Sequence, residues 1–346
     1  MKVDAPLYSF DAPEAEARRL ESKGYAGAFT YEGNHDPFFP LVLAAKATER
    51  LELFTAVAIG FARNPMILAN LGWDLQAISK GRFRLGLGTQ IKPHIERRFG
   101  MPWSRPAARM KEMVLAIKEI WRCWETNERL DYRGEIYQHT LMTPVFNPGP
   151  HPYGHPPIFL AGVGPKMTEV CGEVADGFFV HPFGTHQSLR ELTFPALERG
   201  LARGGRDRSI LEISAQVMVC TGTNDEEIEK SRQATRQQIA FYGSTPAYRP
   251  VLEVHGWGDL QGELNSMTKR GQWEAMADLV SDELLEAIAV CVPIGEVAES
   301  VRARVEGVAD RVSLVAHWTK DPDMWDDIVR DLSVEGEGFV SNDLNR

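Results

Sequence analysis

The sequence predicts a (β/α)8 barrel of the TIM type, forming a single domain over residues 1–346, and three observations lead to this fold class. Short apolar segments alternate with amphipathic helical segments along most of the chain. The segments with strand character number eight. The chain has 346 residues, which leaves room for insertions beyond the ~250 of a minimal barrel. A doubly wound sheet would also alternate, but no G-x-G-x-x-G fingerprint follows the first strand, so we favour the barrel.

The strand segments are short, rich in apolar residues and bounded by turn residues. They cover 2–10, 27–31, 51–59, 83–88, 157–161, 177–180, 210–220 and 311–318. The helical segments begin at capping residues or prolines and repeat apolar residues three and four apart. They cover 11–24, 39–48, 64–80, 104–125, 165–175, 186–203 and 224–242, and a last helix carries Val297, Val301, Val305 and Val308.

Two stretches interrupt this alternation. Residues 130–157 read as a hairpin that continues into a proline-rich connection, and residues 243–281 are rich in Gly, Trp and Pro. We expect both to be insertions in the barrel rather than domains. Four aromatic residues lie within or just before the second stretch: Phe241, Tyr242, Tyr248 and Trp257. They either line an apolar substrate pocket or pack the insertion onto the barrel.

Composition excludes several classes of partner. The chain carries 38 basic and 48 acidic residues, a net charge of −10, which disfavours nucleic acid and anionic membranes. No apolar run has transmembrane length, and the N-terminus lacks the apolar core of a signal peptide. The four cysteines are far apart and indicate free thiols in a reducing compartment. We therefore expect a cytoplasmic protein that acts on a small molecule.

In a barrel the chemistry lies where strands end and loops begin, and polar residues follow several strands here. The loop "YEGNHDPFFP" after the second strand contains Glu32, Asn34, His35 and Asp36. Asn, Asp and Pro are turn residues in any case, so the loop is a capping turn or a site. His35 is the side chain in it that titrates near neutral pH.

Two further strand ends carry candidate ligand groups. Thr89 and Gln90 follow the fourth strand, as ligand donors or as strand-end hydrogen-bonding groups. The turn "AGVGP" after the fifth strand leads into a helix that begins with proline. A helix N-terminus of this kind leaves the amides of residues 166–168 without helical partners, as an anion site requires, but ordinary α/β turns contain glycine as well.

The sequence gives little support for a metal site or for a hydrolase with a nucleophilic side chain. His151 and His155 lie in a proline-rich loop without a third ligand nearby, so we expect no metal site. No G-x-S-x-G elbow and no local cysteine signature indicate a nucleophile.

Three segments together resemble the luciferase-like flavin and deazaflavin superfamily, and within it the branch that uses coenzyme F420. They are "NPMILANLGWDLQAISKGRFRLGLGTQ" (64–90), "PPIFLAGVGPKMTEVCGEVADGFFV" (156–180) and the "GNHDPFFP" loop. The similarity covers almost the whole chain. It implies a barrel with a flavin-like ring at the carboxyl-terminal mouth of its strands.

The resemblance also implies where the ring lies. It places the ring against the end of the third strand near Thr55, Ala56 and Val57, where relatives carry a bulge with a non-prolyl cis peptide. It sets Thr89 and Gln90 at the polar edge of the ring.

The phosphate of the cofactor would lie on the amides of Gly162, Val163 and Gly164, with Lys166 assisting. Beyond the fourth strand, Lys92, His94 and Arg98 either meet the anionic tail of the cofactor or an acidic substrate, or face solvent.

His35 matches the position of a catalytic histidine in deazaflavin relatives, four residues before an aromatic residue, which is Phe39 here. Glu32, Asn34 and Phe39 would then border the substrate pocket. The sugar-phosphate dehydrogenase branch has an acidic residue after the fourth strand, where this chain reads "TQIKPH". Oxidation of a sugar phosphate is therefore disfavoured.

The resemblance predicts an F420-dependent oxidoreductase that transfers hydride between the deazaflavin and a small organic substrate, with His35 as acid or base. One alternative is an FMN-dependent monooxygenase that uses reduced flavin and O2. Another is a non-catalytic protein that binds flavin or deazaflavin. Relatives commonly form homodimers through the helices after the second and third strands, and "MILANLGWDLQAI" is apolar enough to allow this.

Overall fold

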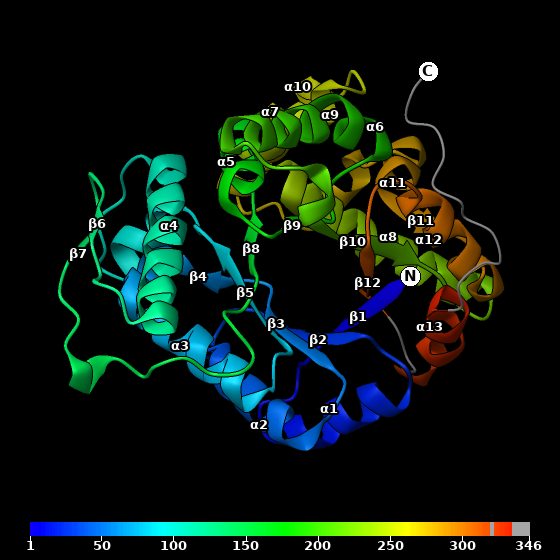
Figure 1. The fold of residues 1–346 in the computed structure, drawn as a ribbon. Coiled ribbons are helices and arrows are strands. Elements are labelled where there is room, and N and C mark those ends of the chain that lie inside the picture. Colours follow the sequence, from blue (N-terminus) through cyan, green and yellow to red (C-terminus); the bar gives the residue numbers. More distant parts are fainter. Residues whose placement is uncertain (319–321, 334–346) are drawn as a thin grey trace.

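The protein is a closed parallel barrel surrounded by helices, seen in a computed structural model that describes residues 1–318 and 322–333 (Figure 1). Within these residues eight strands form the barrel: β1 (Lys2–Pro6), β2 (Gly27–Thr30), β3 (Glu52–Thr55), β5 (Phe83–Gly88), β8 (Ile158–Ala161), β9 (Gly177–Val180), β10 (Glu212–Cys220) and β12 (Arg311–Val315). Each strand pairs in parallel with the next, and β12 pairs with β1 while β10 pairs with both β9 and β12, which closes the ring. The fold class predicted from the sequence is confirmed.

Two short strands extend this sheet. β4 (Ala58–Ile59) continues the line of β3 and pairs with β5. β11 (Ala289–Cys291) pairs with the last residues of β10. Because the predicted strand 51–59 is interrupted after Thr55, the third strand consists of two pieces.

The helices lie outside the ring of strands (Figure 1). Those that follow the barrel strands are α1 (Pro13–Ser22), α2 (Phe38–Ala47), α3 (Pro65–Ile78), α4 (Pro106–Thr126), α5 (Pro165–Val174), α6 (His186–Ser188), α7 (Phe194–Gly204), α8 (Asp225–Gly243), α12 (Val297–Val305) and α13 (Trp325–Ser333). The predicted helix 186–203 comprises α6, a π-helical stretch (Leu189–Thr193) and α7. None of the helices in the described residues has the length and apolarity that a membrane crossing requires.

The stretch 130–157 stands outside α4, at the edge of the molecule (Figure 1). It contains the expected hairpin, formed by β6 (Tyr132–Arg133) and β7 (Gln138–His139). The proline-rich part then returns along α3 and α4 to β8, and its backbone bonds to α3 where Gln76 donates to the Tyr153 carbonyl.

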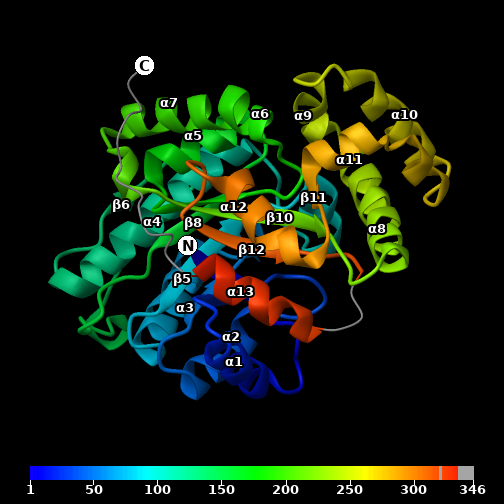
Figure 2. The ribbon, with the colours of Figure 1, turned by 90° about the vertical axis from the view of Figure 1, so that its right-hand side faces the viewer.

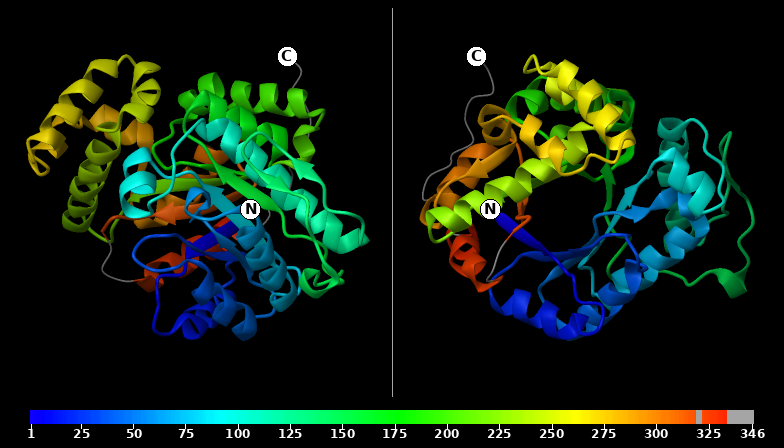
Figure 3. Two further views of the ribbon diagram at one scale, coloured as in Figure 1. Left: turned by 90° about the vertical axis from the view of Figure 1, so that its left-hand side faces the viewer. Right: turned by 180° about the vertical axis from the view of Figure 1, so that it is seen from behind.

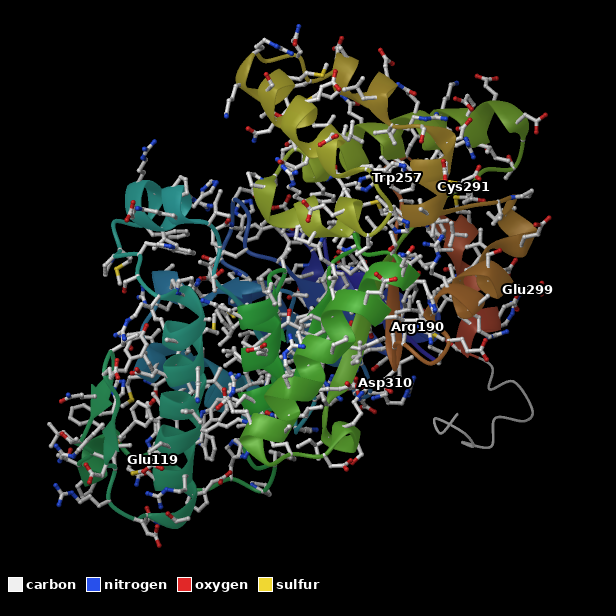
Figure 4. All side chains as sticks on the ribbon, turned by 90° about the horizontal axis from the view of Figure 1, so that it is seen from above. Glu119, Arg190, Trp257, Cys291, Glu299 and Asp310 are labelled. Carbon is white, nitrogen blue, oxygen red and sulfur yellow. The ribbon has the colours of Figure 1, made fainter. Side chains whose placement is uncertain are left out.

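The stretch 243–281 is helical, although its composition suggested an irregular excursion. It forms α9 (Arg249–Glu253), α10 (Gly258–Lys269) and a 3-10 helix (Ala275–Leu279), followed by α11 (Asp282–Ile288), which the sequence did not predict. These helices and α8 gather at one end of the barrel (Figures 2 and 3). In Figure 4, Trp257 marks this region, while Glu119 on α4 lies at the far side of the molecule.

A separate apolar core holds the second insertion in place. It includes Phe183 after β9, Met218 and Cys220 of β10, Ile239 of α8 and Leu264 of α10. The aromatic residues Tyr242, Tyr248 and Trp257 pack against this core. Packing of the insertion onto the barrel, one of the two alternatives for these residues, is therefore present in the structure.

Charged residues fill the amino-terminal end of the barrel. Arg311 is fully buried and donates to both carboxylate oxygens of Asp4, at 2.6 and 2.5 Å. It also contacts Glu52 and Glu212, and Arg84 bonds to the same two glutamates, at 3.0 and 3.4 Å. We call these five residues the floor cluster.

Four aromatic side chains lie next to the floor cluster, and they are packed together: Phe29, Phe54, Phe159 and Phe179. The Arg311 guanidinium lies over the Phe54 ring, 5.1 Å from its centroid, and the rings of Phe54 and Phe179 are 6.0 Å apart. Because ions and aromatic rings fill the interior, the barrel is a packed core, and a ligand has to bind at the carboxyl ends of the strands.

Candidate active site

The predicted site residues follow four barrel strands that are direct neighbours. β2 pairs with β3, β3 with β5, and β5 with β8. The loops that carry His35, the segment 55–57, Thr89–Gln90 and the turn 162–164 therefore leave the barrel side by side. One continuous half of the rim contains all of these residues.

A bulge interrupts the pairing of the third strand at the predicted ring position. Phe54 pairs with Arg84 and Ala58 with Leu87, so β3 and β4 contain one residue more than β5 over this interval. The peptide bond between Ala56 and Val57 is cis. The bulge with a non-prolyl cis peptide, which the resemblance implied, is confirmed.

The side chain of Thr55 replaces strand pairing inside the bulge. Its hydroxyl donates to the Gly86 carbonyl at 2.6 Å and accepts from the Gly86 amide at 3.0 Å. A Cβ on Gly86 would lie 1.7 Å from the Thr55 carbonyl oxygen, so only glycine fits there. Thr55 is fully buried and holds the bulge, whereas Ala56 and Val57 are half-buried.

The loop after β2 is hydrogen-bonded to the bulge. The Glu32 amide donates to the Val57 carbonyl at 3.1 Å. The Glu32 carboxylate, with 7% of its side chain exposed, accepts from the Ile59 amide at 2.7 Å and from Arg63 at 2.6 Å. Glu32 thus uses both backbone and side chain to bind the strand pieces on either side of the bulge.

Arg63 also reaches the far end of this loop. Its second nitrogen lies 2.9 Å from Asp36, whose other carboxylate oxygen accepts from the Phe38 amide at the start of α2. No role for Arg63 follows from the sequence. Nothing in the run "GFARNP" distinguishes it from a solvent-facing arginine, because both of its partners lie about 30 residues earlier in the chain.

His35 is exposed between these anchor points. Its ring stacks on Phe10, with centroids 4.1 Å apart and an angle of 18° between the planes. Asn34 is exposed as well, and Phe39 is 67% exposed. His35 is therefore accessible to a ligand on a loop whose ends are fixed.

Thr89 and Gln90 are half-buried directly after β5. Gln90 has a φ of +58°, and its side-chain oxygen accepts from the Ile91 amide at 3.0 Å. The Thr89 hydroxyl donates to the Gln90 carbonyl at 2.9 Å. Local hydrogen bonding, the second alternative for this pair, engages the Thr89 hydroxyl and both oxygens of Gln90, and within the described residues it leaves the Gln90 side-chain NH2 group available.

The turn after β8 exposes backbone donors. Gly164 caps α5 with extended backbone geometry, and Pro165 begins the helix. The Met167 and Thr168 amides both bond to the Gly164 carbonyl, at 3.1 Å each, so the expectation that they lack helical partners is wrong. The reason is a tight first turn, in which one carbonyl accepts twice. Within the described residues the amides of Gly162, Val163, Gly164 and Lys166 donate to no protein group.

The cations after β5 differ in what they contact. Arg98 donates to the Gly33 carbonyl at 2.6 Å and thus helps to hold the loop of His35. Lys92 is exposed and lies 3.8 Å from Glu96, and His94 is exposed. A structural contact explains Arg98, whereas Lys92 and His94 face solvent.

The two histidines of the proline-rich loop contact tryptophans. The ring centroid of His151 lies 4.2 Å from that of Trp73, and His155 stacks on Trp121 at 5.5 Å. Across residues 1–318 and 322–333, no group of three or more His, Cys, Asp or Glu side chains is arranged to hold a metal ion. All four cysteines are free thiols.

Two known proteins show substantial sequence similarity to this chain. An uncharacterised protein of Mycobacterium tuberculosis is 56% identical over 313 residues, which cover 90% of this chain and 92% of that protein. A 5,10-methylenetetrahydromethanopterin reductase of Archaeoglobus fulgidus is 27% identical over 284 residues, which cover 80% of each.

Solved structures share the fold. A coenzyme F420-dependent tetrahydromethanopterin reductase from Methanopyrus kandleri matches with a TM-score of 0.74, at 19% identity and 96% coverage of each chain. An EDTA monooxygenase from Chelativorans sp. matches with a TM-score of 0.70, at 14% identity, covering 96% of this chain and 92% of that one. The family model described as luciferase-like monooxygenase matches residues 5–311, and the chain therefore belongs to this family.

Proposed function

We propose that the protein is an F420-dependent oxidoreductase that moves a hydride between the deazaflavin and a small organic substrate, with His35 as the acid or base. The observation that carries the proposal is the attachment of the His35 loop to the bulge after β3, through Glu32, Val57 and Arg63. This attachment sets an accessible imidazole beside the segment where the resemblance places the ring.

The residues present fit such a cofactor. The unused amides of residues 162–164 and 166, at the start of α5, suit a phosphate group, because a helix N-terminus carries partial positive charge. Ala56 and Val57 offer an apolar surface to one face of a ring, and the Gln90 side chain offers a donor to its edge. When bound, the deazaflavin supplies the hydride chemistry.

His35 would supply the proton chemistry. Hydride addition to a carbonyl or to a carbon–carbon double bond leaves an anion that needs a proton, and the reverse reaction needs a base. An accessible imidazole can serve in either role. Asn34 on the same loop and Phe39 in the first turn of α2 are exposed and would contact the substrate, while Glu32, expected at the substrate pocket, would act by holding the loop.

An FMN-dependent monooxygenase remains the second candidate, favoured by the family description and by the monooxygenase among the structural neighbours. Equilibrium titration with F420 and with FMN separates the two. We expect F420 to bind the more tightly. Tighter binding of FMN, together with oxygen-dependent product formation from reduced FMN, would overturn the proposal.

A His35→Asn variant tests the catalytic role. We expect the oxidation of reduced F420 by an enone, ketone or imine substrate to slow by about 100-fold or more, because positioned acid–base groups contribute at least this much. The dissociation constant of F420 should change less than twofold. His186→Asn, a substitution at an exposed histidine of α6, serves as the matched control and should keep full activity.

Equal turnover in His35→Asn and the wild type would exclude His35 as the acid or base. Binding of F420 without turnover of any of these substrates would instead favour the non-catalytic alternative.

We further propose that the protein is a homodimer that operates in the cytoplasm. The helices α2 and α3 expose Leu43 and Ile67, which suits an interface with a second copy. Sedimentation equilibrium of the wild type and of an Ile67→Glu variant tests the assembly. A monomeric wild type would contradict it.

A further inference from the structure

A cavity of about 360 Å³ lies on the half of the rim that the predicted site residues do not occupy. Its walls come from α8, the 3-10 helix of the second insertion and the residues after β12. The side chains that line it include Gln237, Gln238, Phe241, Trp273, Met276 and His317. A volume of this size is in the range of sites for small molecules.

The cavity belongs to the carboxyl-terminal end of the barrel. His317 comes two residues after the end of β12. The helix α8 crosses this end, because Ser231 on it accepts from the Thr221 amide just beyond β10, and Ile239 packs on Met218 and Cys220. Figure 2 shows α8 at this end of the barrel, beneath α9 and α10. In the ring of strands only β1 separates β12 from β2, whose loop carries His35.

His317 carries a polar atom without a partner in the part of the chain that the structure describes. Its Nε2 is buried and has no hydrogen-bond partner among the described residues. Burial lowers the pKa of this imidazole, so the ring is neutral at neutral pH and can donate or accept one hydrogen bond. A buried polar atom without a partner costs free energy, and a ligand that binds it would recover that cost.

The walls of the cavity are aromatic and uncharged. Phe241 and Trp273 stand 6.2 Å apart between ring centroids, and both are nearly half exposed. Met276 adds a polarisable side chain, and the two glutamines add neutral amides. None of the lining residues bears a charge at neutral pH, so the cavity has no group to neutralise a phosphate or a carboxylate.

We propose that this cavity binds the substrate, and that the substrate is a neutral molecule with a flat carbon skeleton and a hydroxyl or carbonyl group that bonds to His317. This inference rests on the proposed function, because only an enzyme has a substrate. Binding to the cavity can nevertheless be measured without turnover. At the carboxyl-terminal end of the barrel, the turn 162–164 would then bind the cofactor phosphate, and the uncharged cavity would bind the substrate.

Binding of matched probes tests the proposal without a reaction. The full chain, with and without F420, is titrated by calorimetry with 2-naphthol, with 2-naphthoate, which has the same skeleton and a charge, and with glucose 6-phosphate. We expect 2-naphthol to bind and the two anions to bind at least tenfold more weakly. A Phe241→Ala variant should also weaken 2-naphthol binding, because it removes one aromatic wall.

The variant His317→Leu keeps the bulk and removes the polar atom. We expect its affinity for 2-naphthol to fall by about tenfold, the value of one buried hydrogen bond. His139→Leu is the matched control, because His139 in the hairpin of the first insertion has the same kind of buried, unpartnered Nε2. It should bind 2-naphthol like the wild type. A thermal melt of each variant confirms folding, and Phe241→Ala serves alone if His317→Leu does not fold.

Three results would overturn the proposal: no binding of 2-naphthol, equal binding of the anionic probes, or unchanged affinity in both His317→Leu and Phe241→Ala. A failure of the proposed function looks different, because the same protein would then bind 2-naphthol at His317 but would not bind F420.

Discussion

Arg63 is one of the side chains that fix the loop of His35 to the barrel. It bonds to Glu32 at the start of the loop and to Asp36 at its end, and only 14% of it is exposed. Its guanidinium also lies 5.4 Å from the centre of the Phe38 ring. If His35 is the proposed acid or base, Arg63 would act on it by positioning its loop.

An Arg63→Met variant should lower kcat about tenfold while the KM for F420 changes little, because His35 loses its position and the phosphate turn is untouched. Breaking the buried pair with Glu32 should also reduce the free energy of unfolding by about 3 kcal/mol. Steady-state kinetics and urea unfolding measure the two effects. Arg63→Lys should restore part of kcat, and Arg18→Met, on the exposed face of α1, should behave like the wild type. Equal kcat in both Arg63 variants and the wild type would contradict a positioning role.

The residue types at the site could be predicted from the sequence, but their partners could not. His35, Thr89, Gln90 and the turn 162–164 stand at strand ends, which a periodic pattern reveals. The use of Glu32 as an anchor depends on Arg63 and on the backbone of Ile59, which are contacts across two loops. No local pattern carries that information.

At the scale of single elements, the start of α5 contains two kinds of backbone amide. Those of Met167 and Thr168 donate within the helix, and within the described residues those of the preceding turn donate to no protein group. The two amides that bond to the Gly164 carbonyl keep the first turn in place, and the amides before Pro165 remain available. The backbone of Gly164 has φ −91° and ψ 156°, which proline can nearly adopt, and no atom lies within 4 Å of a Cβ built there.

Two substitutions at Gly164 therefore separate the amide from the shape of the turn. Gly164→Pro removes one N–H, and we expect the affinity for F420 to fall by about tenfold, as for loss of one hydrogen bond to a charged group. Gly164→Ala keeps the N–H and should bind F420 like the wild type. Fluorescence titration gives both constants. If Gly164→Pro binds F420 as tightly as Gly164→Ala, the phosphate does not use this amide.

Elements with local sequence patterns were predicted well, and those that depend on packing were not. Most helices that follow barrel strands have prolines or capping residues at their starts, such as Asn64 before α3. By contrast, α9 is five residues long and α10 contains Gly258 and Gly262, so neither is stable on its own. They exist because Leu252 and Leu264 are buried in the second apolar core, which the sequence does not show.

For the whole molecule, the floor cluster joins strands from both ends of the chain. Burial alone would raise the pKa values of Glu52 and Glu212, but Arg311 and Arg84 lower them below the ordinary 4.5. A depressed carboxyl pKa stabilises the fold above the unfolded-state pKa, and this contribution is lost as the pH falls through and below 4.5. Acid should therefore weaken the bonds of the two glutamates, whereas burial raises the pKa of Asp4, so Asp4 does not add to this loss.

An Arg311→Met variant should lose about 3 to 5 kcal/mol of unfolding free energy at pH 7, because Asp4 would remain buried without its partner. Its stability should also depend less on pH between 5 and 3 than that of the wild type, since the glutamates lose the cation that lowers their pKa. Urea unfolding over this pH range measures both. Arg330→Met removes an exposed ion pair with Asp327 and should change stability by less than about 0.5 kcal/mol. Similar losses of unfolding free energy in the two variants would show that the floor cluster stabilises the fold no more than an exposed ion pair does.

The ion pair between Asp4 and Arg311 also bears on the order in which the barrel strands are synthesised and paired. The two residues are 307 positions apart, so seven of the eight barrel strands are synthesised before Arg311, which bonds to Asp4, Glu52 and Glu212. Until then the three carboxylates lack their bonds to Arg311. Because β12 pairs with both β1 and β10, the ring of strands cannot close before this last barrel strand has been made.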